Sequence, residues 1–356
     1  LEAHTGKEVW VFDPATEDDA LKNEPLRYYK VNRGVDCWKA SDGKETRLFY
    51  NVGEKIYAIN GSTGQPIRSF GEKGYVDLRK NLDRDFGGTQ PFIVSTSQPI
   101  IYENLLISGS RVAETADAAP GHIRAFNVLS GEVEWIFHTI PHPGELGYET
   151  WKDPEAYKKL GGANNWAGMS LDPEKGIVYI PTGSASGDFY GGYREGSNLF
   201  ANSLVALNAK TGKYVWHFQT VHHDLWDRDL PANPNLVDLN QNGKTIEAVA
   251  QITKQGYIFV FDRITGQPVF EIKETPVSQD ALPGEKPWPT QPIPVLPEPF
   301  ARQSFEEEDV TRISDSTHQV MLERYRQIEH KEMFAPPSKA GSWIFPGFDG
   351  GGEWGG

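Results

Sequence analysis

The sequence has little cysteine, no excess of basic residues and no long apolar run. Its single cysteine, Cys37, excludes an intramolecular disulfide and a cysteine-rich zinc site. Against 49 aspartates and glutamates there are only 35 lysines and arginines, so the formal net charge is −14. Nucleic acid and anionic membrane surfaces are therefore not expected as partners. No apolar stretch approaches the roughly 20 residues of a membrane-spanning helix. Membrane association would thus depend on parts of the protein outside this sequence.

Glycine, proline and aromatic residues are abundant. The 356 residues include 36 glycines, 25 prolines and 10 tryptophans, and charged residues make up 24%. This composition is typical of a globular protein with a large core and many turns, and it predicts an all-β fold. The chain starts at LEAHTGKEVW without an initiator methionine and ends in DGGGEWGG. We therefore expect an interior part of a longer protein.

A hairpin motif recurs along the chain, as in VALNAKTGKYVW at residues 205–216. A strand with alternating apolar residues ends in Asn or Asp, and a Ser/Thr-Gly turn leads to a second strand that often ends in tryptophan. Glycine supplies the positive φ that a tight turn requires, and tryptophan is large enough to fill the space between stacked sheets. The turn glycines are Gly6, Gly64, Gly131, Gly212 and Gly266.

Repeats of this length, each with several short strands, predict the blades of a β-propeller in one domain over residues 1–356. An ordinary β-sandwich with similar hairpins is the alternative. Two segments break the pattern. Residues 276–299 contain eight prolines and predict an extended excursion over the surface. Residues 316–331 place Val320, Met321, Tyr325 and Ile328 near helical spacing and predict one short amphipathic helix.

The densest group of ionisable residues lies in HFQTVHHDLWDRDLPANP, residues 217–234. The spacing of its histidines and carboxylates does not match a zinc-binding HExxH motif. A solvated loop is the simplest interpretation, but Trp226 argues against it because an indole is usually packed. An aspartate beside packed aromatics can have a raised pKa and can act as a general base.

This segment resembles the signature of pyrroloquinoline-quinone (PQQ) dependent dehydrogenases, and in particular their glucose and quinate dehydrogenase branch. The resemblance covers almost the whole chain. Further matches are NRGVDCW at 32–38, GHIRAFNVLSGEVEW at 121–135, NNWAGMSLD at 164–172 and TKQGYIFVFDRITG at 253–266. The resemblance implies an eight-bladed propeller that holds PQQ and a divalent cation on its axis. The first and last blades would be missing from this chain.

The resemblance also implies roles for individual residues. Asp227 matches the catalytic base that takes the proton of the substrate hydroxyl while hydride passes to PQQ. Lys254 matches the cation that bonds the quinone oxygens and stabilises charge as PQQ is reduced. Trp166 matches the indole beneath the planar cofactor.

Other matches concern the cation and the cofactor edge. Glu114, Ser186 and Asp227 are the expected ligands of Ca²⁺ or Mg²⁺. The residues expected to touch PQQ, beside Trp166 and Lys254, are Arg33, Thr96 and Trp354, the last beside glycines 350–352. Asp188 falls in the loop that shapes the metal side.

Three positions depart from the family patterns. Ser184 stands where the alcohol-oxidising branch has an asparagine ligand, Cys37 cannot form that branch's disulfide, and Tyr29 replaces a histidine of the glucose branch. The expected protein is a periplasmic dehydrogenase that oxidises a sugar, polyol or other alcohol. It would pass electrons to ubiquinone or a cytochrome. The alternative is a non-catalytic propeller with PQQ-like repeats that serves as a scaffold.

Overall fold

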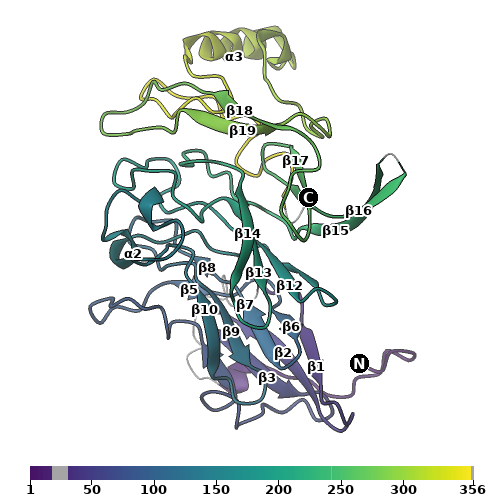
Figure 1. Ribbon diagram of the computed structural model, residues 1–356. Helices are drawn as coiled ribbons and strands as arrows, with labels where there is room; N and C mark the ends of the chain where they lie inside the picture. The colour runs from purple at the N-terminus through teal and green to yellow at the C-terminus, as the bar shows by residue number, and fades with distance from the viewer. Residues whose placement is uncertain (18–30, 242, 354–356) are drawn as a thin grey trace.

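The structure is a computed structural model that describes residues 1–17, 31–241 and 243–353. Within them the fold is all-β, with few short helices. Three four-stranded antiparallel sheets and one three-stranded sheet follow each other in chain order. Figure 1 shows this order as the colour change from purple to green along the molecule.

Each large sheet is built mainly from consecutive strands. The first has the order β1 (Asp36–Lys39), β2 (Thr46–Val52), β3 (Lys55–Asn60) and β4 (Tyr75–Asp77). The second has the order β10 (Val133–Phe137), β9 (Ile123–Asn127), β7 (Leu105–Ser108) and β6 (Ile100–Tyr102). The third has the order β11 (Ser170–Asp172), β12 (Ile177–Pro181), β13 (Ser203–Asn208) and β14 (Tyr214–Gln219). The fourth has the order β15 (Asn235–Gln241), β16 (Lys244–Ile252) and β17 (Ile258–Asp262). A small pair joins β5 (Ile93–Val94) to β8 (Arg111–Val112).

The tryptophan that ends one repeat packs on the turn glycine of the next. The pairs are Trp10 with Gly64, Trp135 with Gly212, and Trp216 with Gly266. A Cβ atom on Gly212 would lie 2.6 Å from the Trp135 ring, so the glycine is needed for this approach as well as for its φ of +67°. Trp135 Nε1 also donates to the carbonyl of Ala209 at 3.3 Å. The repeated motif therefore fastens one sheet to another.

The hydrophobic core lies between successive sheets. One cluster joins Phe49 and Ile56 of the first sheet to Leu106 and Phe126 of the second. The next joins the second sheet to the third, and another joins the third to the fourth. Face-to-face packing of this kind buries both faces of the inner sheets, which is why strands such as β12 are buried along their whole length.

Replacing Gly212 by alanine tests the contact with Trp135. Gly43 is the matched control, because its φ is +71° and a Cβ there would have no atom within 4 Å. Both substitutions cost about 1–2 kcal/mol for the left-handed backbone. Gly212→Ala should lose roughly 1–3 kcal/mol more in urea unfolding, because the new methyl overlaps the indole. Equal losses for the two variants would show that the contact does not stabilise the protein.

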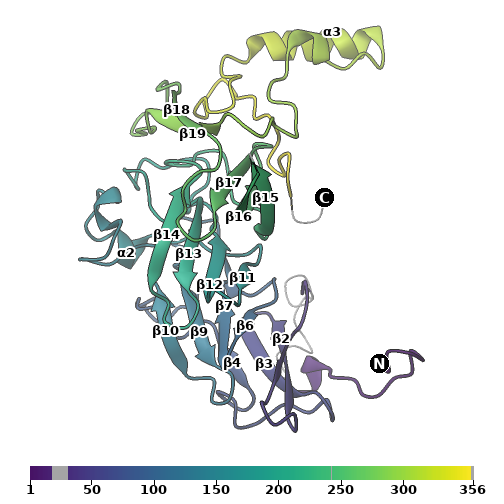
Figure 2. The same cartoon turned by 45° about the vertical axis from the view of Figure 1, so that its right-hand side comes forward.

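The segment after β17 contains a strand pair that the sequence did not predict. Part of the proline-rich stretch forms an antiparallel pair of β18 (Ile272–Pro276) with β19 (Thr290–Pro294). Helix α3 (Asp315–Gln327) overlaps the predicted helix and lies at the end of the molecule opposite β2 and β3 (Figure 2). It buries Leu322 and Tyr325, whereas Val320 is 64% exposed. The predicted apolar face was therefore wrong at Val320.

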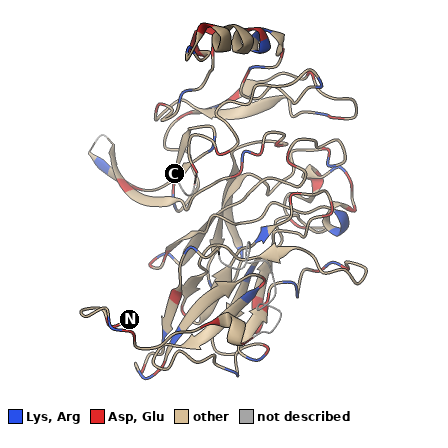
Figure 3. Ribbon diagram, turned by 180° about the vertical axis from the view of Figure 1, so that it is seen from behind, with Lys and Arg blue, Asp and Glu red and all other residues tan. Residues whose placement is uncertain are grey.

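The remaining helices are short. They are α2 (Ala156–Lys159), η1 (Pro14–Thr16), η2 (Tyr148–Thr150) and η3 (Glu307–Asp309). Among the described residues, no helix combines the length and apolar character needed to cross a bilayer. Lysines and arginines are interspersed with acidic residues along the described chain (Figure 3).

Candidate active site

A cavity of about 370 Å³ collects side chains from widely separated parts of the chain. This volume is within the usual range for a small-molecule site. Every described residue that the sequence predicts for the site lines it: Arg33, Thr96, Glu114, Trp166, Ser186, Asp227 and Lys254. Trp354, also predicted, lies outside the described residues. The cavity also takes in Arg111, Asn164, Asp188 and Asp229.

Asp227 and Lys254 form an ion pair at the cavity wall. Lys254 Nζ lies 3.0 Å from Asp227 Oδ2 and donates to the Asp227 backbone carbonyl at 3.1 Å. Lys254 is only 4% exposed. Burial disfavours its ammonium, but Asp229 and Asp227 outweigh this effect and raise its pKa. Lys254 therefore presents a positive charge to the cavity.

Trp166 is held in place through both its backbone and its ring. Ser97 Oγ and Thr96 Oγ1 donate to the Trp166 carbonyl at 2.6 Å and 3.3 Å. The indole Nε1 donates to Asp229 Oδ2 at 2.7 Å. The Arg33 guanidinium lies 5.6 Å from the centroid of the Trp166 ring, within cation–π range. The result is a fixed aromatic surface with a cation beside it.

Carboxyl groups crowd one side of the cavity. Burial, followed by repulsion from Asp229, raises the pKa of Asp227 to about 8. Burial and then repulsion from Asp229 and Asp224 raise the pKa of Asp188 to about 7. Oxygen donors gathered in this way are the ligand set that a hard divalent cation prefers.

Two of the predicted cation ligands have contrasting environments. The Glu114 side chain is 69% exposed and its carboxylate lies 3.4 Å from Arg111 Nη2. Ser186 is buried and its hydroxyl has no hydrogen-bond partner among the described residues. A buried hydroxyl without a partner is costly unless a ligand or water completes its bonding. Ser186 is thus suited to contact a bound group, whereas Glu114 lies at the rim.

Asp224 fixes the loop that carries Asp227. Its Oδ2 accepts from the Arg228 backbone N–H at 2.6 Å and from Asn202 Nδ2 at 2.8 Å. The Ser184 hydroxyl donates to the same oxygen. Because these bonds span the ends of the loop and an adjacent strand connection, Asp224 acts as a structural anchor. Asp227 itself has a φ of +55°, a conformation that aspartate and asparagine tolerate.

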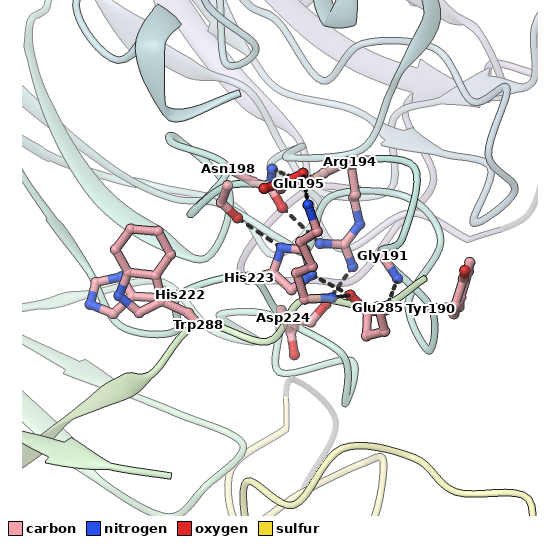
Figure 4. Close-up of polar contacts among 12 residues, drawn as sticks. Tyr190, Gly191, Arg194, Glu195, Asn198, His222, His223, Asp224, Glu285 and Trp288 are labelled. Carbon is pink, nitrogen blue, oxygen red and sulfur yellow. Dashed lines mark hydrogen bonds and ion pairs between the residues drawn. The ribbon is translucent and has the colours of Figure 1, made fainter. Parts of the chain in front are cut away.

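The proline-rich segment braces the start of the same loop (Figure 4). His223 is fully buried, with Nε2 2.7 Å from Glu285 Oε1 and Nδ1 2.8 Å from the Gly196 carbonyl. The neighbouring His222 packs beside Trp288, with 5.7 Å between ring centroids. The histidine pair of HHDLWD therefore connects the loop to the proline-rich segment around Glu285 and does not face the cavity.

Glu285→Gln should weaken this brace. Burial disfavours the Glu285 carboxylate, but hydrogen bonds from His223 and the Gly191 N–H outweigh burial and lower its pKa. The ionised group therefore stabilises the fold above the pKa of an unfolded glutamate, and this contribution is lost as pH falls through the lowered pKa. Unfolding at pH 7 should show a loss of about 1.5–3 kcal/mol, which shrinks in acid. Exposed Glu298→Gln is the control, and equal stability of both variants at pH 7 would contradict the brace.

Sequence reasoning missed the part played by Asp229 and Arg111. Asp229 stands two residues after Asp227 in the acidic run, but only the fold reveals that it holds Trp166 and the Ser184 backbone N–H. Arg111 lies in β8, in a segment without a recognisable motif. Its position three residues before Glu114 was the only available signal.

Comparison with known proteins defines the class. The PQQ family described as glucose/ethanol/alcohol dehydrogenase, β-propeller domain, matches residues 1–356. The chain therefore belongs to this family of quinoprotein β-propellers. Within it, the chain is 33% identical to quinoprotein glucose dehydrogenase A of Acinetobacter calcoaceticus, over 100% of this chain and 46% of that protein. It is 35% identical to quinate/shikimate dehydrogenase (quinone) of Acinetobacter baylyi, over 100% of this chain and 45% of that protein.

Solved structures agree with this assignment. Quinohemoprotein alcohol dehydrogenase from Comamonas testosteroni aligns with a TM-score of 0.60 at 26% identity, over 80% of this chain and 41% of that one. A europium-containing methanol dehydrogenase shares the fold, with a TM-score of 0.60 at 19% identity, over 91% of this chain and 49% of that one. The chain spans about half the length of the curated relatives that it matches.

Proposed function

We propose that this chain forms the cofactor-binding part of a PQQ-dependent dehydrogenase that oxidises a sugar, polyol or other alcohol. The observation that carries the proposal is the convergence of Trp166, Asp227 and Lys254 on one cavity, although they come from three separate segments. Electron transfer to ubiquinone or a cytochrome, a periplasmic location and an eight-bladed ring in the complete protein belong to the same proposal. They rest on the family resemblance.

The chemistry of the cavity fits PQQ and a divalent cation. A flat, anionic quinone suits an aromatic surface flanked by cations, and Trp166, Arg33 and Lys254 supply these. Calcium or magnesium suits the oxygen donors of Asp227, Ser186 and Glu114. A cation there would also relieve the repulsion that contributes to the raised pKa of Asp227.

The side chains of the cavity have different roles in the proposed reaction. When bound, PQQ supplies the two-electron acceptor that these side chains lack. Asp227, in its ionised form, accepts the proton of the substrate hydroxyl. Lys254, held 3.0 Å from Asp227, places positive charge where negative charge develops. Asp229 keeps the Trp166 ring oriented through its hydrogen bond to Nε1.

The direct test uses the complete protein freed of cofactor. It is titrated with PQQ in the presence and absence of Ca²⁺, and then assayed with a dye acceptor against a panel of sugars, polyols and alcohols. We expect saturable PQQ binding that needs the cation and turnover of at least one substrate class. Absence of PQQ binding with either Ca²⁺ or Mg²⁺ would refute the proposal and would favour a non-catalytic propeller.

Trp166→Ala should weaken PQQ binding about tenfold, since loss of an aromatic stacking partner costs roughly 0.5–1.5 kcal/mol beyond buried area. Trp166→Phe keeps a flat ring but loses the hydrogen bond to Asp229, so it should retain most of the affinity. Trp10→Ala, at an indole that packs on Gly64 and does not line the cavity, is the control. Affinity is measured by quenching of tryptophan fluorescence. If Trp166→Ala binds as tightly as the control, the indole does not contact the cofactor.

A further inference from the structure

Three histidines meet at one end of the second sheet, outside the cavity. His122 directly precedes β9 and His138 directly follows β10. Because Ile123 pairs with Phe137 in the antiparallel ladder, the two histidines that flank this pair are neighbours. His142 lies in the loop that follows. One ring nitrogen from each of the three lies within 4.8 Å of the others.

His122 has ring nitrogens that make no hydrogen bond to the described residues. The residue is 1% exposed, so these nitrogens are buried. The Leu82 backbone lies near the ring and favours its charged form. Burial, followed by the neighbouring His138 and Arg124, lowers its pKa well below the ordinary histidine value. A buried imidazole whose nitrogens make no hydrogen bond can offer one of them to a metal ion.

His138 has the environment of a histidine that binds a metal. Its Nδ1 lies 2.8 Å from Glu145 Oε1, and its Nε2 lies 3.2 Å from Asp83 Oδ2. A carboxylate on one nitrogen that orients the other toward an ion is the usual outer-shell arrangement. Glu145 also accepts from the His142 backbone N–H at 2.7 Å, so it positions two of the three histidines.

His142 has room to adjust. Its ring stacks on that of His138, with centroids 3.8 Å apart and planes 7° apart, and it is only half-buried. Two nitrogens bound to one tetrahedral zinc lie about 3.3 Å apart, given bonds of about 2.0–2.1 Å. The present separations of up to 4.8 Å thus require the nitrogens to approach by roughly 1–1.5 Å. The His142 ring, which is now parallel to that of His138, must also turn so that both nitrogens point at one ion.

We propose that His122, His138 and His142, with the Asp83 carboxylate as fourth ligand, bind a divalent transition-metal ion of the zinc type. Imidazole donors favour zinc and its neighbours over calcium, so the ion would differ from the one expected in the cavity. None of the four residues lines that cavity. The rival explanation is that His138 merely bridges Glu145 and Asp83 through hydrogen bonds.

A metal ion bound to these histidines would stabilise the wall of the cavity without lining it. The Gly121 N–H, next to His122, donates to the Gly162 carbonyl at 2.9 Å, and Gly162 lines the cavity. A metal at the histidines would join the segment after β4, the start of β9 and the loop after β10. Its role would be structural, and its effect should appear as stability.

The test uses the complete, tag-free protein, stripped with a chelator and held in excess Ca²⁺ so that oxygen-rich sites are filled. Zn²⁺ is titrated calorimetrically, and Co²⁺ is followed by its visible absorption. We expect binding at the histidines to raise the thermal midpoint, with Zn²⁺ displacing Co²⁺. Glu145→Gln should weaken zinc binding about 10–100-fold, and His142→Asn should weaken it more.

His4→Asn is the control, since the His4 side chain is 78% exposed and lies outside the cluster. It should bind zinc as the unmodified protein does. Circular dichroism of each variant separates loss of the site from loss of the fold. The absence of zinc and cobalt binding to the unmodified protein would overturn the proposal. So would equal zinc affinity in folded His142→Asn and His4→Asn.

Discussion

Asp227→Asn in the complete protein is expected to retain PQQ binding and to lose about 10²–10⁴ in turnover, the usual effect of removing a positioned base. Asparagine preserves the size of the side chain and tolerates the φ of +55° at this position. It can still accept a hydrogen bond from Lys254, but it cannot take up a substrate proton at neutral pH. The rate is measured with saturating PQQ and Ca²⁺, so that weaker binding is not mistaken for slower chemistry.

The control for this experiment is Asp238→Asn. Asp238 lies in β15 with its side chain 65% exposed, and it is not part of the cavity. It should match the unmodified protein in both PQQ affinity and turnover. If Asp227→Asn also turns over at the unmodified rate when saturated, Asp227 is not the base.

Lys254→Met should lower turnover by about 10²–10³, comparable with the loss of one preorganised charge-stabilising donor. Methionine keeps most of the buried aliphatic volume and removes only the ammonium group. Lys254→Arg retains the charge and should recover part of the rate. The pair therefore distinguishes charge stabilisation from packing.

Stopped-flow measurement of PQQ reduction at saturating substrate gives the relevant rate. Urea unfolding of both variants is the accompanying control, because Lys254 is buried and its bonds to Asp227 also hold the loop. A Lys254→Met variant that reduces PQQ as fast as the unmodified protein would remove Lys254 from the chemistry.

The regular parts of the fold were accessible from sequence because they depend on local patterns. Alternating apolar residues, turn glycines and terminal tryptophans repeat along the chain, and the structure uses Trp135 and Trp216 alike to contact the following repeat. The cavity residues were predicted by family resemblance. Each lies in a short contiguous motif, such as NNWAG or HHDLWD, that can be recognised in the sequence alone. The structure brings those motifs to one cavity, while their chemical roles stay predictions.

What the sequence could not supply were contacts between distant segments. Glu285 lies 62 residues after His223, and nothing in the proline-rich segment indicates that it would pair with a buried histidine. Asp83 and His138 are separated by 55 residues, so the histidine cluster has only the four-residue spacing of His138 and His142 as a sequence signal. Helix α3 shows that a local pattern can also be insufficient. Helical spacing alone did not decide whether Val320 or Leu322 faces the protein.

The most direct test of the central claim is a crystal structure of the complete protein with PQQ and Ca²⁺. The account predicts PQQ in the cavity, in contact with the Trp166 ring and with Lys254, and a cation bound by oxygens that include those of Asp227. PQQ located elsewhere, or a cation site that excludes Asp227 while Lys254 makes no contact with the cofactor, would contradict it.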